Sequence, residues 1–287
     1  MDWLYQFPFQ YTVDTDAIDS GFRSFAVSAD VILSAIRNGL NSLLTVINDI
    51  LVFIPWWVFV LAVFFIGFKQ SKKITTGVVY AVMLYLIGMV GLWDLMIPTL
   101  AIIVAAVFIS ILFGFPIGVL VSTSDRANNI VRPILDTMQT MPIFVYLIPA
   151  VLLFGLGRVP GVMATVIYSI VPVIRLTNLG IRQVNEEVVE AAKAFGSTKL
   201  QSMIKVQIPQ AFPTIMAGVN QTLMMAMAMV VTTSMIGVAG LGLEVLISVN
   251  RIEVGRGLVS GTAVVIIAIL LDRLSQGWVK QREVEED

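Results

Sequence analysis

The sequence predicts an all-α polytopic membrane protein with about seven spans and an amphipathic helix near the N-terminus. Of its 287 residues, 57% are hydrophobic and 13% are charged, and the mean hydropathy is +0.91. Soluble domains are far more polar than this. A membrane helix needs about 20 mostly apolar residues. Seven stretches approach that length, at about 53–69, 75–93, 97–122, 141–157, 160–179, 212–236 and 256–274.

The N-terminal segment, residues 1–52, precedes the first of these stretches. It starts with acidic residues and lacks the basic start and apolar core of a cleaved signal peptide. In residues 29–52, apolar side chains recur with a period of 3.6, and polar side chains fill the opposite face. This pattern predicts an amphipathic helix on the outer membrane surface. A poorly apolar span is the alternative, but the stretch contains three Asn and two Asp residues.

Proline and tryptophan residues mark the ends of several predicted spans. Pro55 turns the chain before Trp56 and Trp57, which suit the membrane interface. Pro142 and Pro149 make the stretch at 141–157 short and interrupted. Further ends or kinks are expected at Pro98, Pro116 and Pro172. We expect two peripheral spans in residues 53–93, a core domain in 94–275 and a tail in 276–287.

The distribution of Lys and Arg predicts the orientation, because cytoplasmic segments carry an excess of them. In the predicted topology one side receives thirteen of the 18 basic residues, including Lys69, Arg126, Arg132, Arg175 and Lys199. The other side receives Arg23, Arg37, Arg158, Arg251 and Arg256. The richer side should be cytoplasmic, so the N-terminus lies outside and the C-terminus inside.

A polar interruption between the fifth and sixth spans has clear helix signals. Asn185 is a good N-cap, and Glu186 and Glu187 follow it in the first turn, where negative charge suits the helix dipole. Gly196 can take the left-handed conformation that ends the helix. Thr198 and Gln201 predict a capping box for a second short helix, and Pro209 either stops it or opens the next span.

This segment resembles the cytoplasmic coupling motif of ABC-importer permeases, E-A-A-x3-G-x9-I-x-L-P. The matching residues are Glu190, Ala191, Ala192, Gly196, Val206, Ile208 and Pro209. Val206 and Ile208 replace the usual Ile and Leu and remain apolar. The resemblance implies that helices at 186–208 dock into a cleft on an ATPase subunit. An ordinary amphipathic loop helix is the alternative, but it does not require Gly and Pro at these offsets.

Further segments are similar to the permease subunit of glycine betaine/proline betaine importers. They are residues 130–142 (IVRPILDTMQTMP), 144–147 (FVYL), 175–180 (RLTNLG), 213–223 (PTIMAGVNQTL) and 271–274 (LDRL). The resemblance implies a type I importer domain in the inner membrane of a prokaryote. It also implies an ABC ATPase dimer, a second copy of the permease and a separate extracytoplasmic substrate-binding protein as partners. Choline or another methylated amine is the alternative substrate.

Two groups of residues are candidates for the translocation path and for its outer gate. Polar and aromatic side chains within the spans predict a path lined by Gln139, Thr140, Phe144, Tyr146, Asn220 and Gln221. Helix-to-helix hydrogen bonding and ordinary packing are the alternatives. Gly237, Gly240 and Gly242 allow a sharp turn that could form part of an outer gate or be a plain turn.

The composition also argues against other functions. With no His and no Cys, the commonest catalytic base and metal ligands are missing, so we expect neither catalysis nor a metal site. We expect ATP and Mg²⁺ to bind to a partner ATPase and no cofactor to bind here, since no P-loop is present. A net charge of −1 argues against nucleic acid. An ATPase-independent secondary transporter would not explain the coupling motif. The span interiors show no charged pair suited to a zwitterion, so no tight substrate site is expected.

Overall fold

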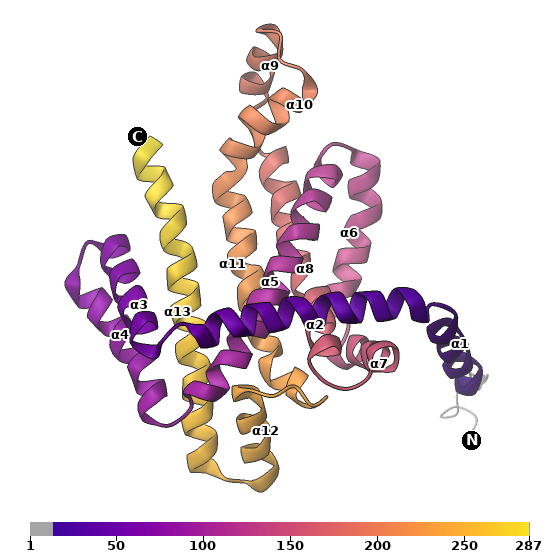
Figure 1. Ribbon diagram of the computed structural model, residues 1–287. Helices are drawn as coiled ribbons and strands as arrows, with labels where there is room; N and C mark the ends of the chain where they lie inside the picture. Colours follow the sequence, from indigo (N-terminus) through magenta and orange to yellow (C-terminus); the bar gives the residue numbers. More distant parts are fainter. Residues whose placement is uncertain (1–13, 287) are drawn as a thin grey trace, which may run out of the picture.

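The computed structural model describes the backbone of residues 14–286 and the side chains of residues 14–276. Within this range the chain is helical and contains no strand. The core of the bundle is formed by α5 (Trp93–Ser122), α8 (Arg158–Arg182) and α11 (Ile208–Ser234), with α13 (Val254–Glu286) alongside (Figure 1). An all-α fold is therefore confirmed.

Small residues bring the central helices close together. A Cβ atom on Gly118 of α5 would lie 2.7 Å from the Thr177 side chain of α8. One on Gly180 of α8 would lie 2.9 Å from the Thr214 side chain of α11. Membrane helices associate through such close contacts, because lipid gives apolar side chains no drive to cluster. The result is that α8 is packed tightly on both sides.

The helices α3 (Trp56–Ser71) and α4 (Ile74–Met89) form a hairpin at the edge of the bundle (Figure 1). They pack against α13, and the Gln70 side chain donates to the carbonyl of Leu274 at 2.9 Å. Both lie within the predicted pair of peripheral spans.

The predicted amphipathic helix is present as α2 (Asp30–Phe53). It is bent by 90° relative to α3, as expected if it runs along the surface before the chain enters the membrane. Part of its apolar face, including Leu33 and Leu44, is buried against α5, α7 and α8, while Ile32 and Ile50 remain exposed. A further helix, α1 (Thr15–Ser28), was not expected from the sequence; Asp14 caps its N-terminus.

The number of spans is not confirmed as seven. Among the described residues, four helices are long and apolar enough to cross a membrane. The number rises to six if each of two bent helix pairs is one span, and the first of these pairs is α2 with α3. The second pair is α6 (Asp125–Thr140) and α7 (Ile143–Phe154), which meet at 93°. The predicted span at 141–157 is thus the 12-residue α7. At a rise of about 1.5 Å per residue, that helix cannot cross a membrane alone.

The internal prolines do not end the helices. Pro98 and Pro116 lie inside α5, and Pro172 lies inside α8. The fold tolerates them because neighbouring helices and side chains can satisfy the backbone groups that proline leaves free. Pro142, by contrast, is the N-cap of α7 and does mark a boundary.

Candidate coupling segment and translocation path

The segment that carries the coupling motif projects beyond the bundle as α9 (Glu186–Ala194) and α10 (Lys199–Ser202) (Figure 1). Its caps match the sequence prediction. The Asn185 side chain accepts a hydrogen bond from the amide of Glu187 at 2.9 Å. Thr198 and Gln201 form the complete capping box. Each helix start is therefore capped by side chains of its own segment.

Gly196 makes the turn between the two helices. Its φ is +85°, and no atom lies within 4 Å of the position that a Cβ would occupy. The glycine is required by backbone conformation and not by packing. After α10, the π-helical turn η2 (Met203–Gln207) leads directly into α11, where Pro209 lies in the first turn. Pro209 therefore opens the next span, one of the two alternatives that the sequence left open.

The motif residues divide between the surface and the bundle. Glu190, Ala191 and Pro209 are exposed, and Ala192, Val206 and Ile208 are half-buried. Ile208 packs on a buried cluster of Ile181, Ala211 and Ile215. Nearby, Phe195 is 93% exposed and Leu200 is 68% exposed. Exposed large apolar side chains on a projecting segment are characteristic of a surface that a partner covers.

A cleft of about 350 Å³ separates α9 from the rest of the bundle. Its lining includes Glu186, Glu190 and Lys193 from α9 and Arg182 from the end of α8. Glu190 thus lines the side of α9 that faces the bundle. Arg182 connects this cleft to the α5–α6 junction, since it pairs with Asp125 at 2.6 Å.

Four of the candidate path residues lie at the bend between α6 and α7. Gln139 and Thr140 end α6, whereas Phe144 and Tyr146 lie on α7. Thr140 and Phe144 are exposed, and Gln139 is half-buried. The buried Tyr146 hydroxyl donates to the carbonyl of Met138 across the bend. Tyr146 therefore holds the two helices in their bent arrangement.

The other two candidates lie on α11 and differ from each other. Gln221 is exposed. The Asn220 amide donates to Asp272 Oδ1 at 2.9 Å and accepts from Ser275 Oγ at 2.5 Å, both on α13. These contacts match the helix-to-helix alternative for Asn220. Arg273 is exposed and forms no ion pair with Asp272 among the described side chains.

Two of the candidate gate glycines, Gly237 and Gly240, form a tight turn before α12 (Leu241–Arg251), and Gly242 lies in the first turn of α12. This turn is at the end of the bundle opposite α9 and α10 (Figure 1). Gly237 and Gly240 have φ values of +87° and +137°. The amide of Leu241 donates to Thr99 Oγ1 at 2.9 Å. A Cβ on Gly242 would lie 2.2 Å from the carbonyl oxygen of Val230. The turn is therefore fixed against α5 and α11.

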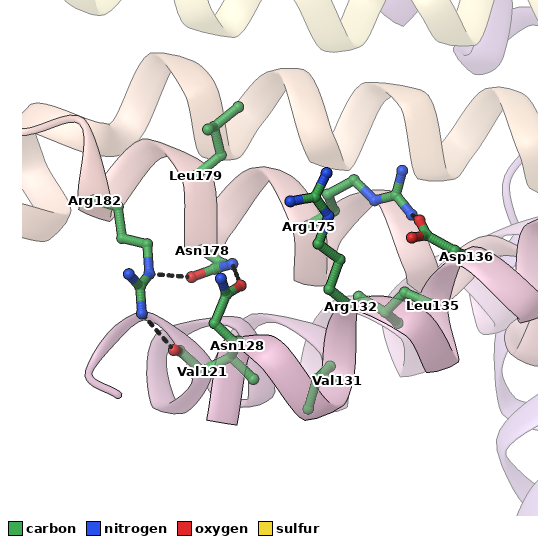
Figure 2. A pocket seen from close by; sticks show the side chains of 10 residues that line it. All are labelled: Val121, Asn128, Val131, Arg132, Leu135, Asp136, Arg175, Asn178, Leu179 and Arg182. Carbon is green, nitrogen blue, oxygen red and sulfur yellow. Dashed lines mark hydrogen bonds and ion pairs between the residues drawn. The ribbon is translucent and has the colours of Figure 1, made fainter. Parts of the chain in front are cut away.

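A cavity of about 330 Å³ between α6 and α8, lined by both apolar and charged side chains, was not expected from the sequence. Figure 2 shows its polar side chains, and two of its contacts are Arg175 to Asp136 at 2.6 Å and Asn178 to Asn128 at 2.7 Å. The basic residues Arg132 and Arg175 lie within helices, although the orientation argument counted them with the cytoplasmic positions. Among the described residues, no group of three acidic side chains is placed to hold a metal ion.

The fold is that of the transmembrane domain of type I ABC importers. An inward-facing crystal structure of the MetNI methionine ABC transporter superposes with a TM-score of 0.55, at 21% identity over 69% of this chain and 95% of that chain. A crystal structure of an amino acid ABC transporter with histidines gives a TM-score of 0.55, at 22% identity over 71% of this chain and 98% of that one. At these identities, the likeness concerns the fold alone.

The chain belongs to the family of binding-protein-dependent transport system inner membrane components, which it matches over residues 106–282. It is 43% identical to the glycine betaine transport system permease protein OpuAB of Bacillus subtilis, over 96% of each chain. It is 46% identical to the glycine betaine/carnitine transport permease protein GbuB of Listeria monocytogenes, over 81% of this chain and 83% of the relative.

It is also 50% identical to the glycine betaine/proline betaine transport system permease protein ProW of Escherichia coli, over 72% of this chain. This chain spans 58% of the length of that relative. The resemblance that the sequence motifs indicated is therefore confirmed, and the chain is an inner membrane component of a transport system with several apolar helices.

Proposed function

We propose that this chain is the permease subunit of an ATP-driven importer for osmoprotectants of the glycine betaine and proline betaine type. The observation that carries the proposal is the segment α9–α10, which presents the coupling motif and exposed apolar side chains outside the bundle. The names of the relatives give the substrate class. Choline or another methylated amine is the alternative substrate for the same machinery.

The partners follow from this role. An ABC ATPase dimer would cover α9 and α10 and bind the ATP and Mg²⁺, while this chain binds no cofactor and carries out no catalysis. A second copy of the permease would complete the path, and a separate extracytoplasmic protein would deliver the substrate. The N-terminus would lie outside and the C-terminus in the cytoplasm, which puts α9 and α10 on the side where ATP is available.

The mechanism is a binding-energy mechanism. Closure of the ATPase dimer on ATP would move α9, and α9 is joined to the bundle through α8 on one side and through η2 and α11 on the other. A rigid displacement of the docked segment therefore reaches two central helices at once. The difference in ATPase affinity between the two bundle conformations sets how far the equilibrium moves.

Reconstitution tests the proposal. The chain, co-expressed with an ABC ATPase and an extracytoplasmic binding protein, should co-purify with the ATPase and import labelled glycine betaine into proteoliposomes only when ATP is supplied. Unlabelled choline and proline betaine, added separately as competitors, identify the preferred substrate. Uptake that proceeds without an ATPase would instead support the secondary-transporter alternative.

A further inference from the structure

The cavity between α6 and α8 contains an unusual arrangement of charge (Figure 2). Arg175 on α8 pairs with Asp136 on α6, at 2.6 Å between Nη2 and Oδ1. Arg132, one helical turn before Asp136, reaches into the same cavity and has no hydrogen-bond or ion-pair partner among the described residues. The cavity therefore holds the Arg175–Asp136 ion pair and, in Arg132, one guanidinium group without a partner. Arg182, which also lines the cavity, is neutralised by Asp125 at 2.6 Å.

The carboxylate of Asp136 also has unused capacity. Its Oδ1 accepts from Arg175, and among the described residues its Oδ2 takes no hydrogen bond. A carboxylate offers about four acceptor positions on its two oxygens. The lining of the cavity thus includes an unpaired guanidinium group and a carboxylate oxygen that takes no hydrogen bond, together with the apolar side chains of Val131, Leu135 and Leu179.

These charges lie inside the helices, although Asp136 is only four residues before the end of α6 at the bend to α7. Arg175 is seven residues from the end of α8 and Asp136 is eleven residues from the start of α6, which is about two and three helical turns. Charged side chains at such positions rarely face lipid, because leaving water without a partner is costly. This face of α6 should therefore line a protein- or water-filled space, as a transport path requires.

We propose that this cavity is a weak site for the zwitterionic substrate near the end of the path that carries the coupling segment. The carboxylate of the substrate binds to Arg132, its quaternary ammonium lies at Asp136 Oδ2, and its methyl groups contact Leu135 and Val131. This inference rests on the proposed function. The sequence missed the site because Asp136 lies in α6, outside every predicted span, so its pairing with Arg175 could not be seen.

A weak site suits release. Arg175 and Asp136 are 41% and 53% exposed and already neutralise each other, and exposed charge pairs gain little free energy because water screens them. A substrate held by one spare guanidinium and one shared carboxylate leaves easily. The site nonetheless gives the charged groups of the substrate partners in a part of the bundle where unpaired charges would be costly.

Saturation-transfer NMR tests the site directly. The permease–ATPase complex, without binding protein and in phosphatidylethanolamine nanodiscs, is titrated with glycine betaine, whose methyl protons report contact with the protein. We expect saturable binding with a dissociation constant in the millimolar range. Arg132→Gln should weaken it about ten-fold or more, since it removes the charged donor that binds the substrate carboxylate. Arg132→Lys should retain part of the binding.

Matched controls separate this site from general charge effects. Arg126 lies on the same helix, is exposed and does not line the cavity, so Arg126→Gln should bind glycine betaine as the parent does. Acetate and tetramethylammonium each carry half of the zwitterion and should compete at least ten-fold less well than glycine betaine. In the Asp136→Asn variant, acetate should instead compete better than glycine betaine, because Arg132 and Arg175 then face no carboxylate.

Three outcomes would overturn the inference. They are unchanged binding in Arg132→Gln, competition by acetate as strong as by glycine betaine in the parent, and loss of betaine binding when phosphatidylglycerol is added, which would assign the cavity to a lipid headgroup. ATP-dependent uptake with the binding protein tests the proposed function separately. A complex that imports glycine betaine but shows none of this binding keeps its function and loses only the site.

Discussion

Asn220 on α11 donates to Asp272 on α13 at 2.9 Å, and this contact joins two helices through residues that are 52 positions apart in the sequence. Gln276 donates to the same carboxylate oxygen at 2.8 Å, and Ser275 donates to the Asn220 carbonyl at 2.5 Å. The four side chains form a small polar network inside an apolar bundle. Such networks stabilise a bundle when each member is satisfied.

Replacement of Asn220 distinguishes its two possible roles. We expect Asn220→Leu to destabilise the complex by about 1–3 kcal/mol, because Asp272 and Ser275 each lose a partner in a half-buried position. The thermal unfolding midpoint should fall, while the half-saturation concentration for uptake stays that of the parent. Gln221→Leu, at the exposed neighbour, should not lower the midpoint. A changed half-saturation concentration with an unchanged midpoint would instead place Asn220 in the path.

Gly196 provides a test of the coupling segment. Gly196→Val forces a β-branched residue to a φ of +85°, at a cost of about 1–2 kcal/mol, and should change the angle between α9 and α10. We expect normal membrane insertion and loss of substrate-stimulated ATP hydrolysis in the reconstituted complex.

Gly196→Asn is the matched control for that experiment. Asn tolerates the left-handed region far better than Val does, and no atom lies within 4 Å of the added Cβ. The Asn variant should therefore keep most of the stimulated hydrolysis. If Val and Asn are equally active, the backbone of Gly196 does not determine docking.

The exposed alanine of the motif tests close approach by the partner. Ala191 is exposed on α9, so Ala191→Trp should leave the permease folded and inserted. If the ATPase docks closely here, the indole will clash, and both co-purification and stimulated hydrolysis should be lost. Full co-purification of this variant would show that the partner binds elsewhere.

Substitution by alanine should have different effects at Gly237 and Gly240, the two positive-φ glycines of the turn before α12. A Cβ at Gly240 would lie 2.4 Å from Thr99 Oγ1, whereas Gly237 has open space around it. Gly240→Ala should cost about 1–3 kcal/mol through overpacking, and it should also weaken the Leu241–Thr99 hydrogen bond. Gly237→Ala should cost only backbone strain, about 1 kcal/mol.

The measurements for this pair are the thermal unfolding midpoint and the uptake rate. If the glycines form a plain turn, the unfolding midpoint and the uptake rate should fall together and in proportion. If they form a gate, Gly237→Ala should slow uptake well beyond its small effect on the midpoint. Thr99→Val, which removes the acceptor of the Leu241 amide without adding volume, shows how much of the Gly240 effect comes from that hydrogen bond.

Local signals made the coupling segment predictable from the sequence. The Asn185 cap, the Thr198–Gln201 capping box and the Gly196 turn each depend on residues within four positions of one another. The long apolar helices α5 and α8 were predictable for a similar reason, because composition alone indicates a membrane helix. None of these predictions required knowledge of contacts between residues far apart in the sequence.

The polar elements were not predictable in the same way. α6 is too polar to be recognised as a span, and its role depends on α8, whose Arg175 is 39 residues from Asp136. Asn220 is another case, because an amide in an apolar helix fits a path and a helix contact equally well until Asp272 is located. The sequence of α2 has a clear amphipathic period, but only the structure shows that Leu33 and Leu44 pack against the bundle.

Orientation is the last property that can be tested cleanly, because the chain contains no cysteine and single cysteines can be introduced without background. Asp16 on α1 and Lys199 on α10 are both exposed, so a thiol at either position should react once a reagent reaches it. In intact cells, a membrane-impermeant maleimide should label Asp16→Cys and not Lys199→Cys. After permeabilisation, it should label both, which controls for reactivity. Labelling of Lys199→Cys alone in intact cells would place α9 and α10 outside, where no ATPase could reach them, and would remove the basis of the coupling assignment.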